Sequence, residues 1–184
     1  MLIARRTADS KASLESDHRN VNDVVDSRAW WTARGNRTEE AHPKDWITDE
    51  IVISNRIEAR DGHFLREGGF LSILSLEGST SNQTAEQVGI EDCVFLSLID
   101  GPGNTQEQFD EAVEMLDDLV DGAAPVLVHC HAGRSRSVAV VAAWLRLRRG
   151  LSTEAAFAHI EARRETTVTP QLAALARHAR ALWS

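Results

Sequence analysis

The sequence predicts an α/β fold: a single domain in which a central, mostly parallel sheet of four to five strands is flanked by helices. Two observations lead to it. From Trp46 onward, short apolar runs alternate with segments of helical periodicity, which is typical of layered α/β folds. The chain has 184 residues, enough to bury one substantial core but too few for a second full domain. We therefore expect a folded domain over 46–184 and, over 1–45, a polar and flexible extension. Trp30 and Trp31 of the extension are expected to pack against the domain, and contact with a partner is the alternative.

Four short runs predict the strands: EIVIS (50–54), FLSILSL (70–76), CVFLSLI (93–99) and PVLVHC (125–130). Each is rich in β-branched or aromatic residues, or is bordered by glycine, proline or polar residues. We expect the last run to be central and buried, because it is a nearly continuous β-branched stretch. Pro125 stands at its first position, where a missing N–H is tolerated.

Four segments have the pattern of helices: 105–121, 137–150, 152–165 and 170–183. The first begins at Thr105, a favourable N-cap, and is expected to end at Gly122. The second opens with an apolar half, which predicts burial, and finishes in arginines and Gly150. The fourth opens on Pro170, a residue favoured in the first helical turn.

Composition excludes several classes of function. The formal charge of -8 argues against general attraction to nucleic acid or to an anionic membrane, so any anion site must be local. The longest apolar run, 138–145, is too short to span a bilayer, and the N-terminus has no apolar signal-peptide core. The two cysteines, Cys93 and Cys130, favour free thiols in a reducing compartment, and the cytoplasm is the expected location.

The segment HCHAGRSRS, residues 129–137, lies between the expected central strand and the expected buried helix. Backbone amides at such a strand-to-helix turn point into one concavity, and the helix dipole adds partial positive charge. The segment therefore predicts a binding site for an anion.

Its residue types fit a nucleophile inside an anion cradle. Cys130 is expected to ionise readily, because the same amides, the helix dipole and Arg136 stabilise a thiolate. Five residues separate Cys130 from Arg136, enough for a loop that curls around one tetrahedral oxyanion and returns the guanidinium to two of its oxygens. Gly133 gives the backbone freedom for that curl. Ser137 can donate a hydrogen bond to the thiolate, and His129 can orient the loop through its ring nitrogens.

Displacing an alcohol from phosphate also requires a general acid. Asp100 follows the expected third strand and opens DGPGN, so it is expected at the same edge of a parallel sheet as the cysteine. A simple turn role is the alternative for an aspartate before Gly-Pro-Gly. Asp92 begins that strand and is expected at the opposite edge, while Glu107 and Asp110 lie on a helix and are interpreted as solvated charges.

VHCHAGRSRS resembles the His-Cys-x-x-Gly-x-x-Arg-Ser signature of the cysteine-dependent protein tyrosine phosphatase superfamily, and is most similar to its dual-specificity phosphatase family. ITDEIVISNRIEARDGHFLREGGFLSILSL resembles that family's first strand, short helix and second strand, and SLIDGPGN its general-acid loop. The resemblance covers about 46–183. It implies a catalytic domain that releases phosphate from phosphotyrosine and phosphoserine/threonine proteins without a metal or other cofactor.

The resemblance further implies that Cys130 attacks phosphorus to give a cysteinyl-phosphate, while Asp100 protonates the leaving oxygen and then activates water. Arg136 and the loop amides hold the phosphoryl oxygens, Ser137 assists departure of the thiolate, and His129 supports the loop. Asn55 matches a family position that is often polar, without an assigned role. The implied substrate-binding residues are His131, Ala132, Gly133, Arg134, Ser135 and Arg136.

Several alternatives stay open. Basic residues such as His131 and Arg134 also occur in loops that resemble those of lipid and phosphoinositide phosphatases, so a small phosphomonoester is the alternative substrate. A phosphate-binding module without turnover is the alternative from another class. A zinc site at His129, Cys130 and His131 lacks a second ligand pair at metal spacing. Cys93 is expected in the core, and the alternative is a disulfide that protects Cys130 from oxidation.

Overall fold

The computed structural model describes residues 46–78 and 82–183. The expectations for 1–45, including the packing of Trp30 and Trp31, lie outside these residues. Within them the sheet has four strands: β1 (Ile51–Ser54), β2 (Ser72–Ser75), β3 (Asp92–Phe95) and β4 (Val126–His129). No helix among the described residues is long and apolar enough to cross a bilayer.

All neighbouring strands are parallel, in the order β1-β4-β2-β3. β4 pairs with β1 on one side and β2 on the other, and His129 is level with both Ser54 and Ser75. The carboxyl ends of these three strands therefore meet at one edge of the sheet. The predicted α/β class and the central position of β4 are confirmed, and the sheet is wholly parallel rather than mostly so.

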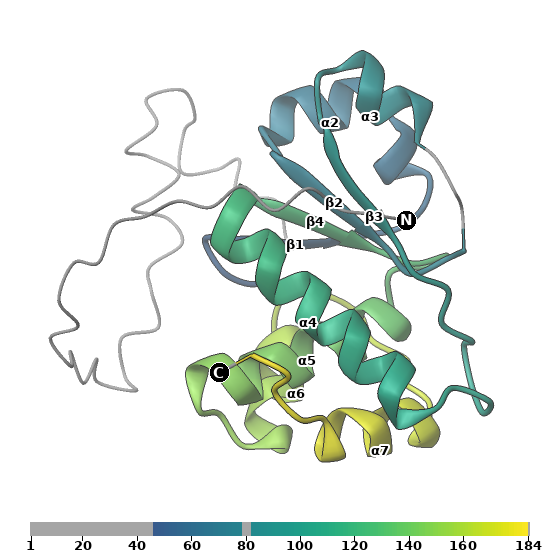
Figure 1. Ribbon diagram of the computed structural model, residues 1–184, viewed down its shortest axis with the longest axis vertical. Coiled ribbons are helices and arrows are strands. Elements are labelled where there is room, and N and C mark those ends of the chain that lie inside the picture. Colours follow the sequence, from purple (N-terminus) through teal and green to yellow (C-terminus); the bar gives the residue numbers. More distant parts are fainter. Residues whose placement is uncertain (1–45, 79–81, 184) are drawn as a thin grey trace, which may run out of the picture.

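Helices cover both faces of the sheet, as βα crossovers require (Figure 1). The 3-10 helix η2 (Glu58–Arg60), α2 (Gly62–Gly68) and α3 (Gln83–Gln87) lie on one face. The other face carries α4 (Gln106–Ala123), α5 (Arg136–Arg149), α6 (Thr153–Glu161) and α7 (Pro170–His178). The predicted N-cap at Thr105 is confirmed: its side chain accepts from the N–H of Gln108, whose side chain accepts from the Thr105 N–H.

The alternation of side chains along each strand divides the core into two parts. Ile51, Ile53, Leu74, Val126 and Val128 pack with α4, α5, α6 and α7, whereas Val52, Ile73 and Leu127 pack with Trp46, Leu65 and Phe70 on the α2 side. The apolar first half of α5 is wholly buried, as its sequence predicts. Burial of β4 and of the first half of α5 fixes the position of the loop that joins them.

Several predicted boundaries are wrong. The third strand ends at Phe95 rather than residue 99. Beyond it the Leu96 N–H donates to the carbonyl of Ser75, the last residue of β2, and the Leu98 N–H donates to the carbonyl of Leu76, which follows β2. Helix α4 continues through Gly122 to Ala123, and α5 begins at Arg136 rather than residue 137. Helices α6 and α7 end at Glu161 and His178, before the predicted 165 and 183.

Tertiary contacts account for the two early helix ends. After α6, the side chain of Arg164 donates to the carbonyl of Ile53 in β1. After α7, Arg146 of α5 donates to the carbonyls of Ala176 and Ala179. Helix α3 was not predicted, because its five residues are too few to show a helical period.

Candidate active site

The segment 130–135 lies at the carboxyl end of β4, between the ends of β1 and β2, and leads directly into α5. Ligand sites of parallel α/β sheets form at this edge, where neighbouring strands diverge to different crossovers. Backbone hydrogen bonds hold the loop from both sides: the Arg56 N–H donates to the His131 carbonyl, and the Thr167 N–H donates to the Arg134 carbonyl.

Gly133 is required where the loop passes the end of β1. Its φ is 69°, and a Cβ there would lie 2.5 Å from the carbonyl oxygen of Ser54 and 2.7 Å from a guanidinium nitrogen of Arg164. Both the left-handed backbone and the close approach exclude a side chain. Glycine at position 133 is thus needed for the backbone freedom that the sequence suggested, and also for the close approach to β1, which only the structure shows.

Cys130 is 1 % exposed, and its Sγ lies 3.3 Å from the Oγ of Ser137. Burial, the largest single influence, raises the pKa of the thiol. Hydrogen bonds from the Ser137 hydroxyl and N–H, the charge of Arg136 and the Gly133 N–H together outweigh it, so the pKa lies below its ordinary value. A thiolate therefore forms more readily at Cys130 than at an ordinary cysteine, despite the burial.

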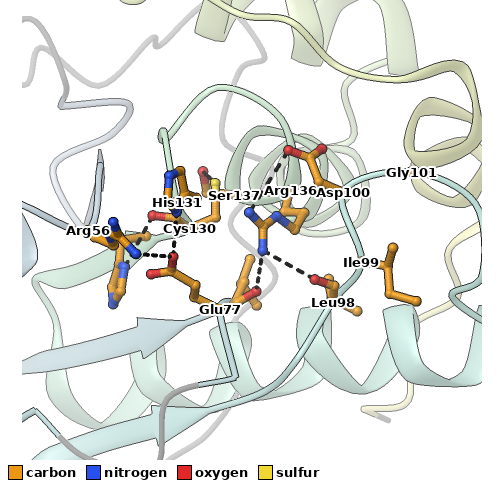
Figure 2. A network of polar contacts seen from close by, with 12 residues as sticks. Arg56, Glu77, Leu98, Ile99, Asp100, Gly101, Cys130, His131, Arg136 and Ser137 are labelled. Atoms are coloured by element: carbon orange, nitrogen blue, oxygen red, sulfur yellow. Dashed lines mark hydrogen bonds and ion pairs between the residues drawn. The ribbon is translucent and has the colours of Figure 1, made fainter.

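Arg136, the first residue of α5, is held by backbone carbonyls from the segments that follow β2 and β3 (Figure 2). Its Nη1 donates to the carbonyls of Leu76 and Leu98 at 3.2 and 3.3 Å. Its Nη2 lies 3.9 Å from Oδ2 of Asp100, and its Nε is buried without a hydrogen-bond partner among the described residues. A buried guanidinium with an unsatisfied donor beside a cysteine is suited to an anion.

Asp100 lies across from Arg136 on the loop between β3 and α4, with its side chain 47 % exposed. Asn104, which the sequence analysis did not single out, shapes this loop. Its Oδ1 accepts from the Ile99 N–H at 2.7 Å, and its Nδ2 donates to the carbonyls of Ile99 and Gly101. Asp92 begins β3 and so lies at the opposite edge of the sheet, as expected.

The interpretation of Asp110 as a solvated charge is wrong. Asp110 is 5 % exposed rather than solvated, because Gln106 and the backbone N–H of Arg180 both donate to its Oδ1. Glu107 is exposed, as predicted.

His129 and Asn55 support the segments around the loop. His129 is 3 % exposed, with Nδ1 3.4 Å from the Cys130 carbonyl oxygen, and burial lowers its pKa, so the ring is neutral. Asn55 caps a turn, because its Oδ1 accepts from the N–H groups of Ile57 and Glu58. In the part of the chain that the structure describes, no group of three or more histidine, cysteine, aspartate or glutamate side chains is arranged to hold a metal ion.

The two basic side chains within the loop are paired with carboxylates that the sequence analysis missed. His131 Nδ1 lies 2.7 Å from Oε1 of Glu77, and Arg134 lies 2.9 Å from Oε2 of Glu165. Arg56 also lies 3.6 Å from Glu77 (Figure 2). No local pattern announces these pairs, because their members are far apart in the sequence and meet only through the fold.

Cys93 is half-buried on the α2 side of the sheet, against the smaller part of the core, whereas Cys130 belongs to the larger part. β2 lies between β3, which carries Cys93, and β4, which ends directly before Cys130. Two strand spacings place β3 and β4 roughly 9–10 Å apart, which is more than the Cα separation of a disulfide. Both thiols are free in this arrangement, and the predicted packing role of Cys93 is supported.

Several solved structures share this fold. The active form of Tk-PTP superposes with a TM-score of 0.60 at 24% identity, over 72% of this chain and 91% of that one. PTPMT1 in complex with PI(5)P gives a TM-score of 0.59 at 20% identity, over 71% of this chain and 90% of that one. At these identities the likeness establishes the fold.

A family model described as "Dual specificity phosphatase, catalytic domain" matches residues 65–178. The chain therefore belongs to the dual specificity phosphatase family, within the superfamily that its signature resembles. It is similar to dual specificity protein phosphatase 1 of Arabidopsis thaliana, with 38% identity over 61 residues, 33% of this chain and 31% of the relative. The matched segments span 31% of this relative's length, and 25% and 30% of the lengths of two others, the Arabidopsis thaliana phosphatase IBR5 and the Drosophila melanogaster phosphatase Mpk3.

Proposed function

We propose that the chain is a protein phosphatase that removes phosphate from phosphotyrosine and phosphoserine/threonine through a cysteinyl-phosphate. The observation that carries the proposal is the buried Arg136 guanidinium, with a donor left unsatisfied, beside a cysteine whose pKa is lowered. A phosphoryl group accepts hydrogen bonds on three oxygens and so matches a guanidinium and a ring of loop amides. Membership of the dual specificity phosphatase family supports the same reaction.

In the first step the Cys130 thiolate attacks phosphorus, a sulfur–phosphorus bond forms, and the bond from phosphorus to the substrate oxygen breaks. Asp100 donates its proton to that leaving oxygen. Arg136 and the amides of His131, Ala132, Gly133, Arg134 and Ser135 hold the three phosphoryl oxygens and balance their charge. The 3.9 Å separation of Asp100 and Arg136 supports this division of roles, because it keeps the acid beside the phosphoryl group.

In the second step the ionised Asp100 removes a proton from water, the water oxygen attacks phosphorus, and the sulfur–phosphorus bond breaks. Inorganic phosphate leaves and Asp100 is protonated again. The departing sulfur carries negative charge, which the Ser137 hydroxyl at 3.3 Å stabilises by donating a hydrogen bond. His129 supports the loop as a neutral ring.

A phosphoinositide is the second candidate substrate. The presence of His131 and Arg134 in the loop favours it, and PTPMT1, a structural neighbour, has been solved with PI(5)P. Both basic side chains are, however, engaged by carboxylates at 2.7 and 2.9 Å. This pairing makes the phosphoprotein the better-supported substrate.

A substrate panel tests the proposal. Phosphate release is measured from phosphotyrosine and phosphothreonine peptides, from phosphoinositides and from an aryl phosphate, with the wild-type chain and Cys130→Ser. We expect the peptides to exceed the lipids in kcat/KM, and release by Cys130→Ser to fall by a factor on the order of 10⁴ or more while peptide binding persists. Faster release from the lipids would favour the second candidate. Binding without release by the wild type would identify a phosphate-binding module instead.

A further inference from the structure

Glu77 lies beside the cradle, two residues beyond the end of β2, and its role is not explained by the reaction steps above. Its side chain is 13 % exposed, and Oε1 contacts His131 Nδ1 at 2.7 Å and Arg56 Nη1 at 3.6 Å (Figure 2). Oε2 is buried without a hydrogen-bond partner among the described residues. A carboxylate this close to the mouth of an anion site repels anions, so its presence there requires an explanation.

The cations around the mouth are matched by acids. Arg56 and Arg134 face Glu77 and Glu165, so the two arginines and the two glutamates together carry no surplus positive charge. Arg136 differs, because its buried Nε has no protein partner in the described part of the chain. Arg136 is therefore available to bind one phosphoryl group, and little positive charge remains to bind a second anion next to it.

The two glutamates are not equivalent. The Glu165 side chain is 67 % exposed, and its pair with Arg134 is screened by water and salt. Glu77 is mostly buried and contacts two basic side chains from different segments, the turn after β1 and the loop after β4. Its charge acts at lower effective dielectric and therefore over a longer range.

We propose that Glu77 is a specificity-determining residue that makes the site discriminate against substrates with a second anionic group beside the phosphate. The inference rests on the proposed function and narrows its substrate class to phosphorylated side chains in a neutral or basic sequence context. Glu77 acts through electrostatic repulsion and by occupying Arg56 and His131, which would otherwise be available to a neighbouring carboxylate or phosphate.

The test compares two phosphotyrosine peptides of equal length whose flanking residues are aspartate in one and asparagine in the other. The readout is the ratio of their kcat/KM values, acidic over neutral, which a general loss of activity does not move. We expect a ratio below one for the wild type, a rise of roughly fivefold in Glu77→Gln at low salt, and a smaller rise at 0.5 M salt. Glu77→Asp, which keeps the charge, should keep the low ratio.

Two further variants serve as controls. Glu50→Gln removes the same charge from an ion pair with Arg149 at the start of β1, the opposite edge of the sheet, and should leave the ratio unchanged. In Arg56→Gln the effect of Glu77→Gln on the ratio should shrink, because Arg56 is no longer there to be released.

The outcomes separate the inference from the proposed function. Turnover of both peptides with the same ratio in wild type and Glu77→Gln overturns the inference and leaves the function standing. Hydrolysis of 4-nitrophenyl phosphate but of neither peptide overturns the function. The charge preference is then decided by 4-nitrophenyl phosphate against an aryl phosphate that carries a carboxylate. No turnover of any substrate overturns both.

Discussion

At the residue scale, the ionisation of Cys130 depends on a balance between burial and hydrogen bonding. Burial raises the pKa of the thiol, while Ser137, Arg136 and Gly133 lower it by more. Ser137 contributes twice, through its hydroxyl and through its backbone N–H. A single side-chain oxygen is thus an experimental handle on the protonation of the nucleophile.

Ser137→Ala should raise the pKa of Cys130, because the hydroxyl hydrogen bond is lost and burial remains. Reaction with iodoacetamide consumes the thiolate, so the pH at which alkylation reaches half its maximal rate should move upward. Turnover should fall by about tenfold as the thiolate becomes a poorer leaving group. Ser135→Ala is the control, since that buried hydroxyl has no hydrogen-bond partner among the described residues, and its alkylation midpoint should not move.

Asp100→Asn removes the proposed proton donor while preserving the shape of the loop. Release of phosphate from phosphothreonine, whose alkoxide needs protonation, should slow by about 10²–10⁴-fold. Release from 4-nitrophenyl phosphate should slow less, because nitrophenolate leaves without a proton. Asp92→Asn, at the opposite edge of the sheet, should leave both rates unchanged. Wild-type rates on phosphothreonine in Asp100→Asn would assign the acid to another residue.

At the scale of elements, the loop between β4 and α5 is shaped by its contact with β1. Gly133→Ala places a Cβ 2.5 Å from the Ser54 carbonyl oxygen, in addition to the cost of a left-handed alanine. Gly150→Ala is a matched control, because its φ of 67° is similar and its added Cβ meets nothing within 4 Å. In urea unfolding, Gly150→Ala should cost about 1–2 kcal/mol and Gly133→Ala about 3 kcal/mol or more. Equal costs would contradict the steric account.

Helices α4 and α5 are joined through Asp117, which is 2 % exposed. Trp144 Nε1 donates to its Oδ1 at 2.9 Å, and Arg148 Nη2 donates to its Oδ2 at 2.5 Å. Asp117→Ala leaves the Trp144 indole without its acceptor and leaves Arg148 paired with the exposed Asp121 alone, and it should lower the free energy of unfolding by about 3 kcal/mol. Asp121, 68 % exposed, contacts the same arginine, so Asp121→Ala should cost about 1 kcal/mol or less. Chemical denaturation of the two variants compares them directly.

At the scale of the whole molecule, the sequence predicted those features that depend on neighbouring residues in the chain. Continuous apolar runs identified β4 and the buried α5, and Thr105 identified the start of α4. The order of residues from Cys130 to Ser137 predicted a cradle because each role follows from residue type at a strand-to-helix turn. Helix ends were predicted less well, because the contacts of Arg164 and Arg146 that terminate α6 and α7 come from elements distant in sequence.

The charges around the cradle depend on the fold. His131 and Arg134 appear in the sequence as basic residues available to a substrate, yet Glu77 and Glu165 engage them. The same applies to Asp110, which reads as a surface charge on α4 and is buried against Gln106 and Arg180. The sequence shows which chemical groups a polar residue carries, but it does not show which other side chain will pair with it. Substrate preference depends on that pairing.

The buried His129 and the half-buried His159 predict that the whole molecule loses stability on mild acidification. Burial lowers the pKa of both His129 and His159 below the ordinary value of 6.5, so the unfolded chain binds protons more readily than the folded one. The stabilisation is complete above pH 6.5 and is lost as the pH falls toward the lowered values, by at most about 1.4 kcal/mol per pH unit for each histidine. Urea unfolding at pH 7.5, 6.5 and 5.5 measures this slope. In His159→Gln the amide still donates to the Ile47 carbonyl, 2.8 Å from the histidine nitrogen, but does not titrate, so the slope should be smaller. A stability that is constant or rises as the pH falls through this range would contradict the lowered pKa of these two rings.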